Sequence, residues 1–175
     1  MHLSAEATIP FPRARVFEAY RDRLPEMIPY LPNIRGIEVK SRRDEGTVTE
    51  LVNLWHGMGE IPAAARAFLD EKLLSWTDHA RWNSADWSCH WRMETHVFTE
   101  AIHAEGDNRY LESGGITRLI IEGELSIDPK KLKGVPRLFA GTVASAAEKI
   151  VIGRVKPNLL EVAAGVSRFL EKGAK

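Results

Sequence analysis

The sequence predicts an α+β fold in which one curved antiparallel sheet packs on a long C-terminal helix. Segments with strand periodicity follow one another along most of the chain, and helical patterns are short except at the C-terminus. Strands in direct succession, with helices kept to one face, are typical of α+β proteins. No linker or internal repeat divides the 175 residues, so we expect one domain, residues 1–175.

The N-terminal part predicts one strand followed by two short helices. Residues 2–9 alternate between apolar and polar side chains, which is the period of a half-buried strand. Residues 10–22 change to helical spacing, and Pro12 suits a first helical position. Residues 24–34 contain three prolines, and each proline ring removes a backbone donor. Only short helical turns therefore fit there.

Six further strands are predicted after these helices. They are residues 35–43, 46–57, 76–82, 87–93, 99–113 and 115–128. Turn residues join the first two of these strands at 44–46 and the next two at 83–86, so both pairs are expected to form hairpins. Between the hairpins, Pro62 and the apolar spacing that follows it predict a short helix at residues 60–74.

The sequence leaves the inward face of the strand at 46–57 open. Leu51 and Trp55 compete for the interior with apolar side chains of the opposite parity. The competing set is Val48, Val52 and Leu54.

Residues 135–173 follow one long helical pattern with an apolar stripe along it. We expect Pro157 to kink this helix and Gly173 to end it. A sheet of about seven strands curls, so the helix is expected to bury its stripe against the concave side.

Four of the five tryptophans and the only cysteine fall within residues 75–91. On the predicted hairpin, Trp76, Asp78 and Trp82 share one parity, and the next strand offers a second row on the same face. That second row is Trp87, Cys89, Trp91 and Met93. Trp76 and Trp87 lie near the hairpin ends, where we interpret them as rim or solvent-facing rings.

The chain resembles the START/Bet v 1-like superfamily, also called SRPBCC, whose fold is known as the helix-grip fold. The resemblance covers nearly the whole chain. It depends on "ATIPFPRARVFEAYRD", "LPNIRGIEVKSRRDEGTVTE", "WTDHARWNSADWSCHWRM", "GGITRLIIEGELSID" and the long final helix. It implies a seven-stranded sheet that grips the C-terminal helix, with a tunnel or cavity between them. Members carry lipids, sterols or plant hormones, cyclise or aromatise polyketides, or bind coenzyme Q.

The first functional prediction is the binding, or transport, of a hydrophobic or amphipathic small molecule such as a lipid. Ligand pockets are concave and mostly apolar, with few polar groups. The alternative from the residues alone is that the same side chains fill a dense core. The predicted lining residues are Trp82, Cys89, Trp91, Met93, Leu119, Ile121, Val151, Val155, Met58 and Phe68. Met58 and Phe68 belong to a segment that we interpret either as a lid or as an ordinary connection.

The second prediction is an enzyme similar to a polyketide cyclase or aromatase, acting in the same cavity. Such an enzyme needs polar groups inside the cavity, and the sequence offers Asp78 and Arg154 as weak candidates. Asp78 is either a ligand anchor or base with a raised pKa, or a strand-end carboxylate that is in water or paired with an arginine. A third alternative is a protein-interaction module with a collapsed cavity and an exposed apolar patch.

Several classes of function are not expected. Lysine plus arginine equals aspartate plus glutamate at 24 each, so a basic surface for nucleic acid is not predicted. The histidines lack metal-ligand spacing, and His79 and His90 have the outward parity, so no metal and no cofactor are expected. One cysteine, no signal peptide and no apolar stretch of membrane-spanning length favour a cytoplasmic protein. Ligand identity and oligomeric state are left open.

Overall fold

The computed structural model describes residues 1–58, 74–96, 98–132 and 136–173, and between 137 and 158 it describes the helix with side chains at only a few positions. The strands are β1 (His2–Ile9), β2 (Ile34–Glu45), β3 (Val48–Gly57), β4 (Ser75–Asn83), β5 (Ser88–Thr95), β6 (Ile102–Ser113) and β7 (Ile116–Ile127). The helices are α1 (Arg13–Asp22), the 3₁₀ helices η1 (Leu24–Tyr30) and η3 (Pro129–Lys131), and α2 (Arg137–Gly173).

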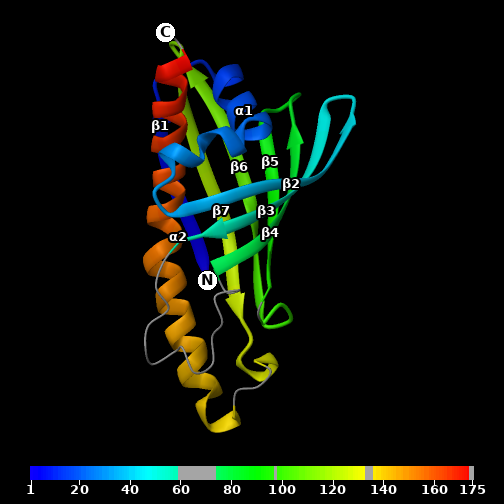
Figure 1. The fold of residues 1–175 in the computed structure, drawn as a ribbon, viewed down its shortest axis with the longest axis vertical. Helices are drawn as coiled ribbons and strands as arrows, with labels where there is room; N and C mark the ends of the chain where they lie inside the picture. The colour runs from blue at the N-terminus through cyan, green and yellow to red at the C-terminus, as the bar shows by residue number, and fades with distance from the viewer. Residues whose placement is uncertain (59–73, 97, 133–135, 174–175) are drawn as a thin grey trace.

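The predicted α+β fold is confirmed. Within the described residues the strands form one antiparallel seven-stranded sheet in the order β1-β7-β6-β5-β4-β3-β2. The long helix α2 runs along this sheet, and α1 and η1 cover the end where the C-terminal part of α2 lies (Figure 1). The two short helices after the first strand are therefore also confirmed.

Most predicted element boundaries are correct to within three residues, and two turns differ. The first hairpin turns around Gly46, whose φ of 60° favours glycine, so β2 extends to Glu45. In the second hairpin the turn takes up Trp87, which has a φ of 59°. The prediction that Trp87 is a strand residue is wrong, because β5 begins only at Ser88. The helix predicted at 60–74 lies, apart from Leu74, outside the described residues.

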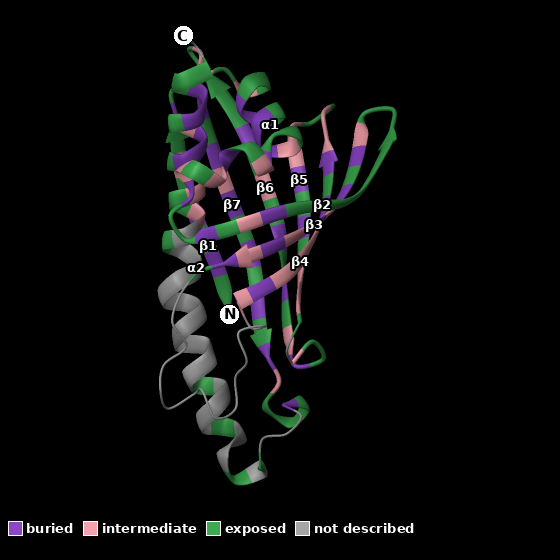
Figure 2. Ribbon diagram, in the orientation of Figure 1, coloured by how far each residue is buried: buried purple, intermediate pink, exposed green. Residues whose placement is uncertain are grey.

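The open question about the third strand is answered by the burial pattern of β3. Leu51 and Trp55 are buried, whereas Val48, Val52 and Leu54 are only half-buried. The inward row also brings Asn53 into the interior, with 1% of its surface exposed. On β2 the residues from Glu38 onward are mostly exposed, so the tip of the β2–β3 hairpin projects from the body (Figure 2).

The largest apolar core lies where α1, η1 and the end of α2 meet the sheet. Phe17 of α1 is at its centre and makes edge-on contacts with three other rings, at centroid distances of 5.2 to 5.3 Å. Those rings belong to Trp82, Trp87 and Tyr110. Such edge-to-face pairs add stability beyond the apolar area that they bury.

Two glycines make room for a tryptophan on the inward face of the sheet. Gly106 and Gly123 lie opposite each other on β6 and β7, and the ring of Trp91 packs over both. A Cβ atom on Gly106 would lie 2.6 Å from that ring, and one on Gly123 would lie 2.9 Å from it. Only glycine therefore fits at these positions while Trp91 stays in place.

Candidate functional site

The β4–β5 hairpin sets six residues of the inward row side by side. The pairs are Trp82 with Cys89, Ala80 with Trp91, and Asp78 with Met93. Side chains directly opposite each other on antiparallel strands have Cβ atoms about 5 Å apart. The predicted tryptophan row and the candidate carboxyl therefore belong to one continuous strip of the sheet.

One end of this strip is filled by packed rings. Trp82 is buried against Phe17, and its ring centroid lies 6.0 Å from that of Tyr110. Trp91 is buried over the glycines, and its indole N–H donates to Oδ1 of Asn108 at 3.0 Å. Trp82, Trp91 and Cys89 are thus parts of a packed core, and their role as ligand-lining residues stays a prediction.

The other end of the strip carries the carboxyl of Asp78. This side chain is half-buried, and its Oδ2 accepts one long hydrogen bond, 3.4 Å, from the amide Nδ2 of Asn53. Burial raises the pKa of Asp78 from 3.8 to about 6, and the Asn53 amide, the His79 imidazole and the Trp55 indole oppose that rise. A carboxyl in this state exchanges its proton close to neutral pH.

A stacked pair of tryptophans lies beside Asp78. Trp55 on β3 pairs with Trp76 on β4, and their rings stack with centroids 5.7 Å apart and an angle of 13° between the planes. The indole N–H of Trp55 is close enough to Asp78 to lower the pKa of that carboxyl, yet it makes no hydrogen bond with any described residue. The inward face therefore carries a stacked pair of rings, a carboxyl and an unpaired donor next to one another.

Sequence reasoning found Asp78 but missed its neighbours. Asn53 and Trp55 belong to the strand whose inward face was left open, and Trp76 was interpreted as a rim residue. In the structure Trp76 is half-buried and packs on the core. The signal that was available is Asn53 itself, because an asparagine between Leu51 and Trp55 places a hydrogen-bonding group in an apolar row.

The structure places the other predicted lining residues in different settings. Leu119 and Ile121 are buried on β7, and Met93 is half-buried on β5. Met58, 49% exposed, follows β3, and its backbone N–H donates to the carbonyl of Asn33 at 2.7 Å. The remaining predicted residues have side chains outside the described part of the chain. They are Phe68, Val151, Val155 and Arg154.

The histidines of the central strands pair with acidic side chains on the outer face of the sheet. His79 lies 3.4 Å from Glu94, and His90 lies 3.0 Å from Asp107. In the residues that the structure describes, no group of three or more His, Cys, Asp or Glu side chains is placed to hold a metal ion. In the same residues, no helix combines the length and the apolar character of a membrane span.

Several further polar atoms on or near α1 are buried and unpaired among the described residues. Among them are the hydroxyl of Tyr20 and the indole N–H of Trp82. Burial raises the pKa of Tyr20, so its hydroxyl stays protonated at any physiological pH and is available as a donor. The carbonyl or hydroxyl oxygen of a bound molecule, or a water, would satisfy either group.

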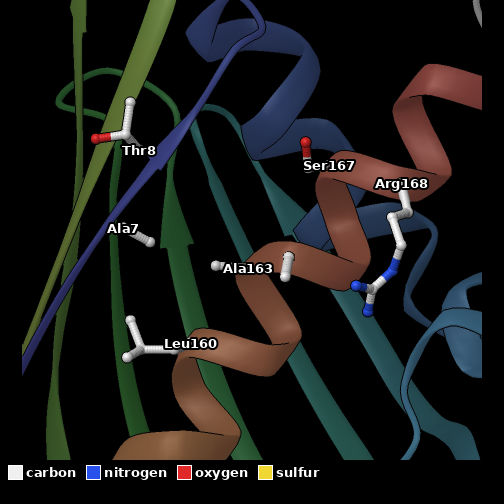
Figure 3. Close-up of a pocket in the computed structure, with 7 residues that line it drawn as sticks. Ala7, Thr8, Leu160, Ala163, Ser167 and Arg168 are labelled. Atoms are coloured by element: carbon white, nitrogen blue, oxygen red, sulfur yellow. The ribbon is translucent and has the colours of Figure 1, made fainter.

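Two pockets lie at different places on the described part of the chain. A groove of about 360 Å³ lies between β1 and α2, where Ala7 faces Leu160 and Ala163, with Ser167 and Arg168 farther along the helix (Figure 3). It is remote from Asp78, because β7, β6 and β5 separate β1 from β4. A second pocket of about 310 Å³ lies between the ends of β5 and β6, and Met93 is one of its lining residues.

Comparison with solved structures identifies the architecture. The Zhui aromatase/cyclase from Streptomyces sp. R1128 is 16% identical with a TM-score of 0.68, and the alignment covers 100% of this chain and 96% of that one. Norcoclaurine synthase from Thalictrum flavum is 12% identical with a TM-score of 0.61, covering 97% and 86% of the two chains. A START superfamily protein from Mycobacterium smegmatis is 12% identical with a TM-score of 0.52, covering 98% and 97%.

The chain has the helix-grip fold. No family model matches the sequence, and no curated protein matches it either. At these levels of identity the likeness extends to the helix-grip fold alone. The resemblance that the sequence motifs predicted is therefore confirmed for the fold, and the activity has to be argued from the site around Asp78.

Proposed function

We propose that this helix-grip protein binds an apolar or amphipathic small molecule, such as a lipid, on the concave face beside Asp78. The observation that carries the proposal is the group of side chains around Asp78. A half-buried carboxyl with a pKa of about 6 lies beside the stacked rings of Trp55 and Trp76, and the Trp55 donor is unpaired among the described residues. Leaving buried polar groups without full partners is costly, and a bound molecule removes that cost.

The mechanism of binding follows from these groups. The stacked rings offer a flat apolar surface for a chain or ring of the ligand. The Asp78 carboxylate accepts a hydrogen bond from a hydroxyl or amine of the ligand, and the Trp55 N–H donates to a ligand oxygen. One acceptor and one donor on the same wall fix the orientation of a ligand that carries its polar atoms at one end.

A tryptophan fluorescence titration tests this proposal. The panel contains a fatty acid, a single-chain phospholipid and a polycyclic phenol. We expect saturable quenching by at least one of them, weakened in Asp78→Asn and with a smaller amplitude in Trp55→Phe. Glu18→Gln, which removes an exposed carboxylate of α1, is the matched control and should titrate like the parent chain. Absence of saturable binding across the panel would reject the proposal.

A second candidate function is a cyclase-like enzyme that uses the same site beside Asp78. One observation favours it, namely that the pKa of Asp78 lies close to neutral pH, where a general base is most effective. A structural neighbour is described as an aromatase/cyclase. In this reaction Asp78 would remove a proton next to a ligand carbonyl while the Trp55 N–H holds the oxygen. Asp78→Asn should abolish turnover of an aromatic polyketide without unfolding the chain, and unchanged turnover would exclude this role.

A further inference from the structure

The pairing of β5 with β6 ends before either strand does. The last pair is Met93 with Ala104. Beyond it, β5 continues through Glu94 and Thr95 as a partner of β4, and β6 begins at Ile102 as a partner of β7. The two central strands of the sheet therefore separate at this end.

Hydrogen bonds fix the chain just after β5 and just before β6. His96, directly after β5, contacts the hydroxyls of Ser75 and Thr77 at 2.9 Å each, which ties this end to β4. On the other side, the backbone N–H groups of Ala101 and Ile102 both donate to the carbonyl of Phe98, at 2.8 and 3.1 Å. These contacts fix the conformation of the chain on either side of the space between β5 and β6.

The pocket of about 310 Å³ lies in this space. It is lined by three consecutive residues of β5, namely Arg92, Met93 and Glu94. Neighbouring residues of a strand point to opposite faces of its sheet. The lining of the pocket therefore includes Met93 of the inward row together with neighbours that belong to the outer face.

Met93 belongs both to the lining of this pocket and to the strip of the sheet that carries Asp78. It is half-buried, it lines the pocket, and it lies directly opposite Asp78 across the β4–β5 pair. Methionine is unbranched and flexible, so its side chain can turn aside at little cost. On the outer side of the pocket, His103 and Glu105 are exposed.

We infer that the opening between β5 and β6 is the entrance through which a small molecule reaches Asp78, and that Met93 controls passage through it. This inference rests on the proposed function, because it concerns access to the same site. It adds a determinant of specificity: a narrow amphipathic ligand passes once Met93 turns aside, whereas a rigid ligand wider than the strand separation does not.

Thiol labelling measures access to the site without any knowledge of the ligand. The reporter is the full chain with Asp78→Cys and Cys89→Ala, so that its one thiol lies at the position of the carboxyl. The reagent is iodoacetamide, which is small and neutral, and the rate is followed by intact mass. The parent chain, whose only thiol is the buried Cys89, measures labelling through general opening of the fold.

We expect Met93→Ala to speed labelling of the reporter by about tenfold, because the half-buried methionine no longer has to be displaced. His103→Trp, an enlargement at the exposed mouth, should slow labelling by a similar factor. Thr8→Trp enlarges an exposed residue of the groove between β1 and α2 and should leave the rate unchanged. Met93→Leu, which keeps the volume, shows whether any change at this position disturbs the fold.

The opposite pattern would overturn the inference. Labelling that is insensitive to Met93→Ala and to His103→Trp, or that is slowed by Thr8→Trp instead, would place the entrance elsewhere. A failure of the fluorescence titration with a normal labelling pattern would reject the ligand class and leave the entrance standing. The two failures are therefore distinguishable.

Discussion

Replacing Asp78 by asparagine should change the stability of the protein in a pH-dependent way. The pKa of this carboxyl is about 6 in the folded chain and 3.8 in its ordinary state. Between these values the folded chain binds more protons than the unfolded chain, so the free energy of unfolding falls as the pH rises. The stabilising contribution of the protonated form is complete below about pH 4 and is lost as the pH rises through 6.

The size of this effect follows from the two pKa values. A difference of about two pH units, at about 1.4 kcal/mol for each, amounts to about 3 kcal/mol. Asparagine has nearly the same shape and carries no charge. The folded and unfolded titrations overlap this range only in part, so Asp78→Asn should gain about 2 kcal/mol relative to the parent chain between pH 4.5 and pH 8. The contact of residue 78 with Asn53 in the variant does not depend on pH. Any weakening of it changes the free energy of unfolding equally at both pH values and cancels from this comparison.

Urea unfolding of both chains at the two pH values measures this difference. Glu18→Gln is again the control, because it removes one exposed carboxylate of α1 and should show a much smaller change with pH. If the stability difference between Asp78→Asn and the parent were the same at pH 4.5 and pH 8, the carboxyl would not be desolvated. Asp78 would then be as well solvated in the folded chain as in the unfolded chain.

Four further predictions concern the stability of the fold. Gly106→Ala should destabilise the fold by more than about 2 kcal/mol in urea unfolding, because its Cβ would lie 2.6 Å from the Trp91 ring and 2.2 Å from a backbone oxygen. Gly141→Ala, at an exposed helical position with open space around it, should instead stabilise by about 0.5 to 1 kcal/mol. Trp82→Ala should lower the free energy of unfolding by about 3 to 5 kcal/mol, measured the same way, since it empties a packed ring cluster. Thr117→Val should cost about 1 to 3 kcal/mol, because its buried hydroxyl donates at 2.7 Å to a carbonyl before α1.

The fold was predictable because local patterns and chain order agree. Residues 2–9 alternate, residues 24–34 carry three prolines, and residues 135–173 hold one helical stripe, and each became the element that its pattern indicates. The turn at Trp87 was not predictable from these rules. Its positive φ is unusual for a tryptophan, and the packing of its ring on Phe17 and under Arg13 accompanies it.

The candidate site was predictable only in part. Asp78 could be found because it shares the parity of the tryptophans along one strand. Asn53 and Trp55 could not be attached to it, because the pairing of β3 with β4 joins residues 25 positions apart and depends on register. The entrance between β5 and β6 depends on where pairing stops, and no pattern within either strand records that point.

The most direct test of the central claim is native mass spectrometry of freshly purified chain, followed by solvent extraction and identification of any compound released. We expect a reproducible added mass that belongs to an apolar or amphipathic compound. The fraction of chain that carries this mass should decrease when Asp78 is replaced by asparagine. The mass of the bare chain, unchanged after incubation with the fatty acid, phospholipid and polycyclic phenol panel, would contradict the claim that this fold holds a ligand beside Asp78.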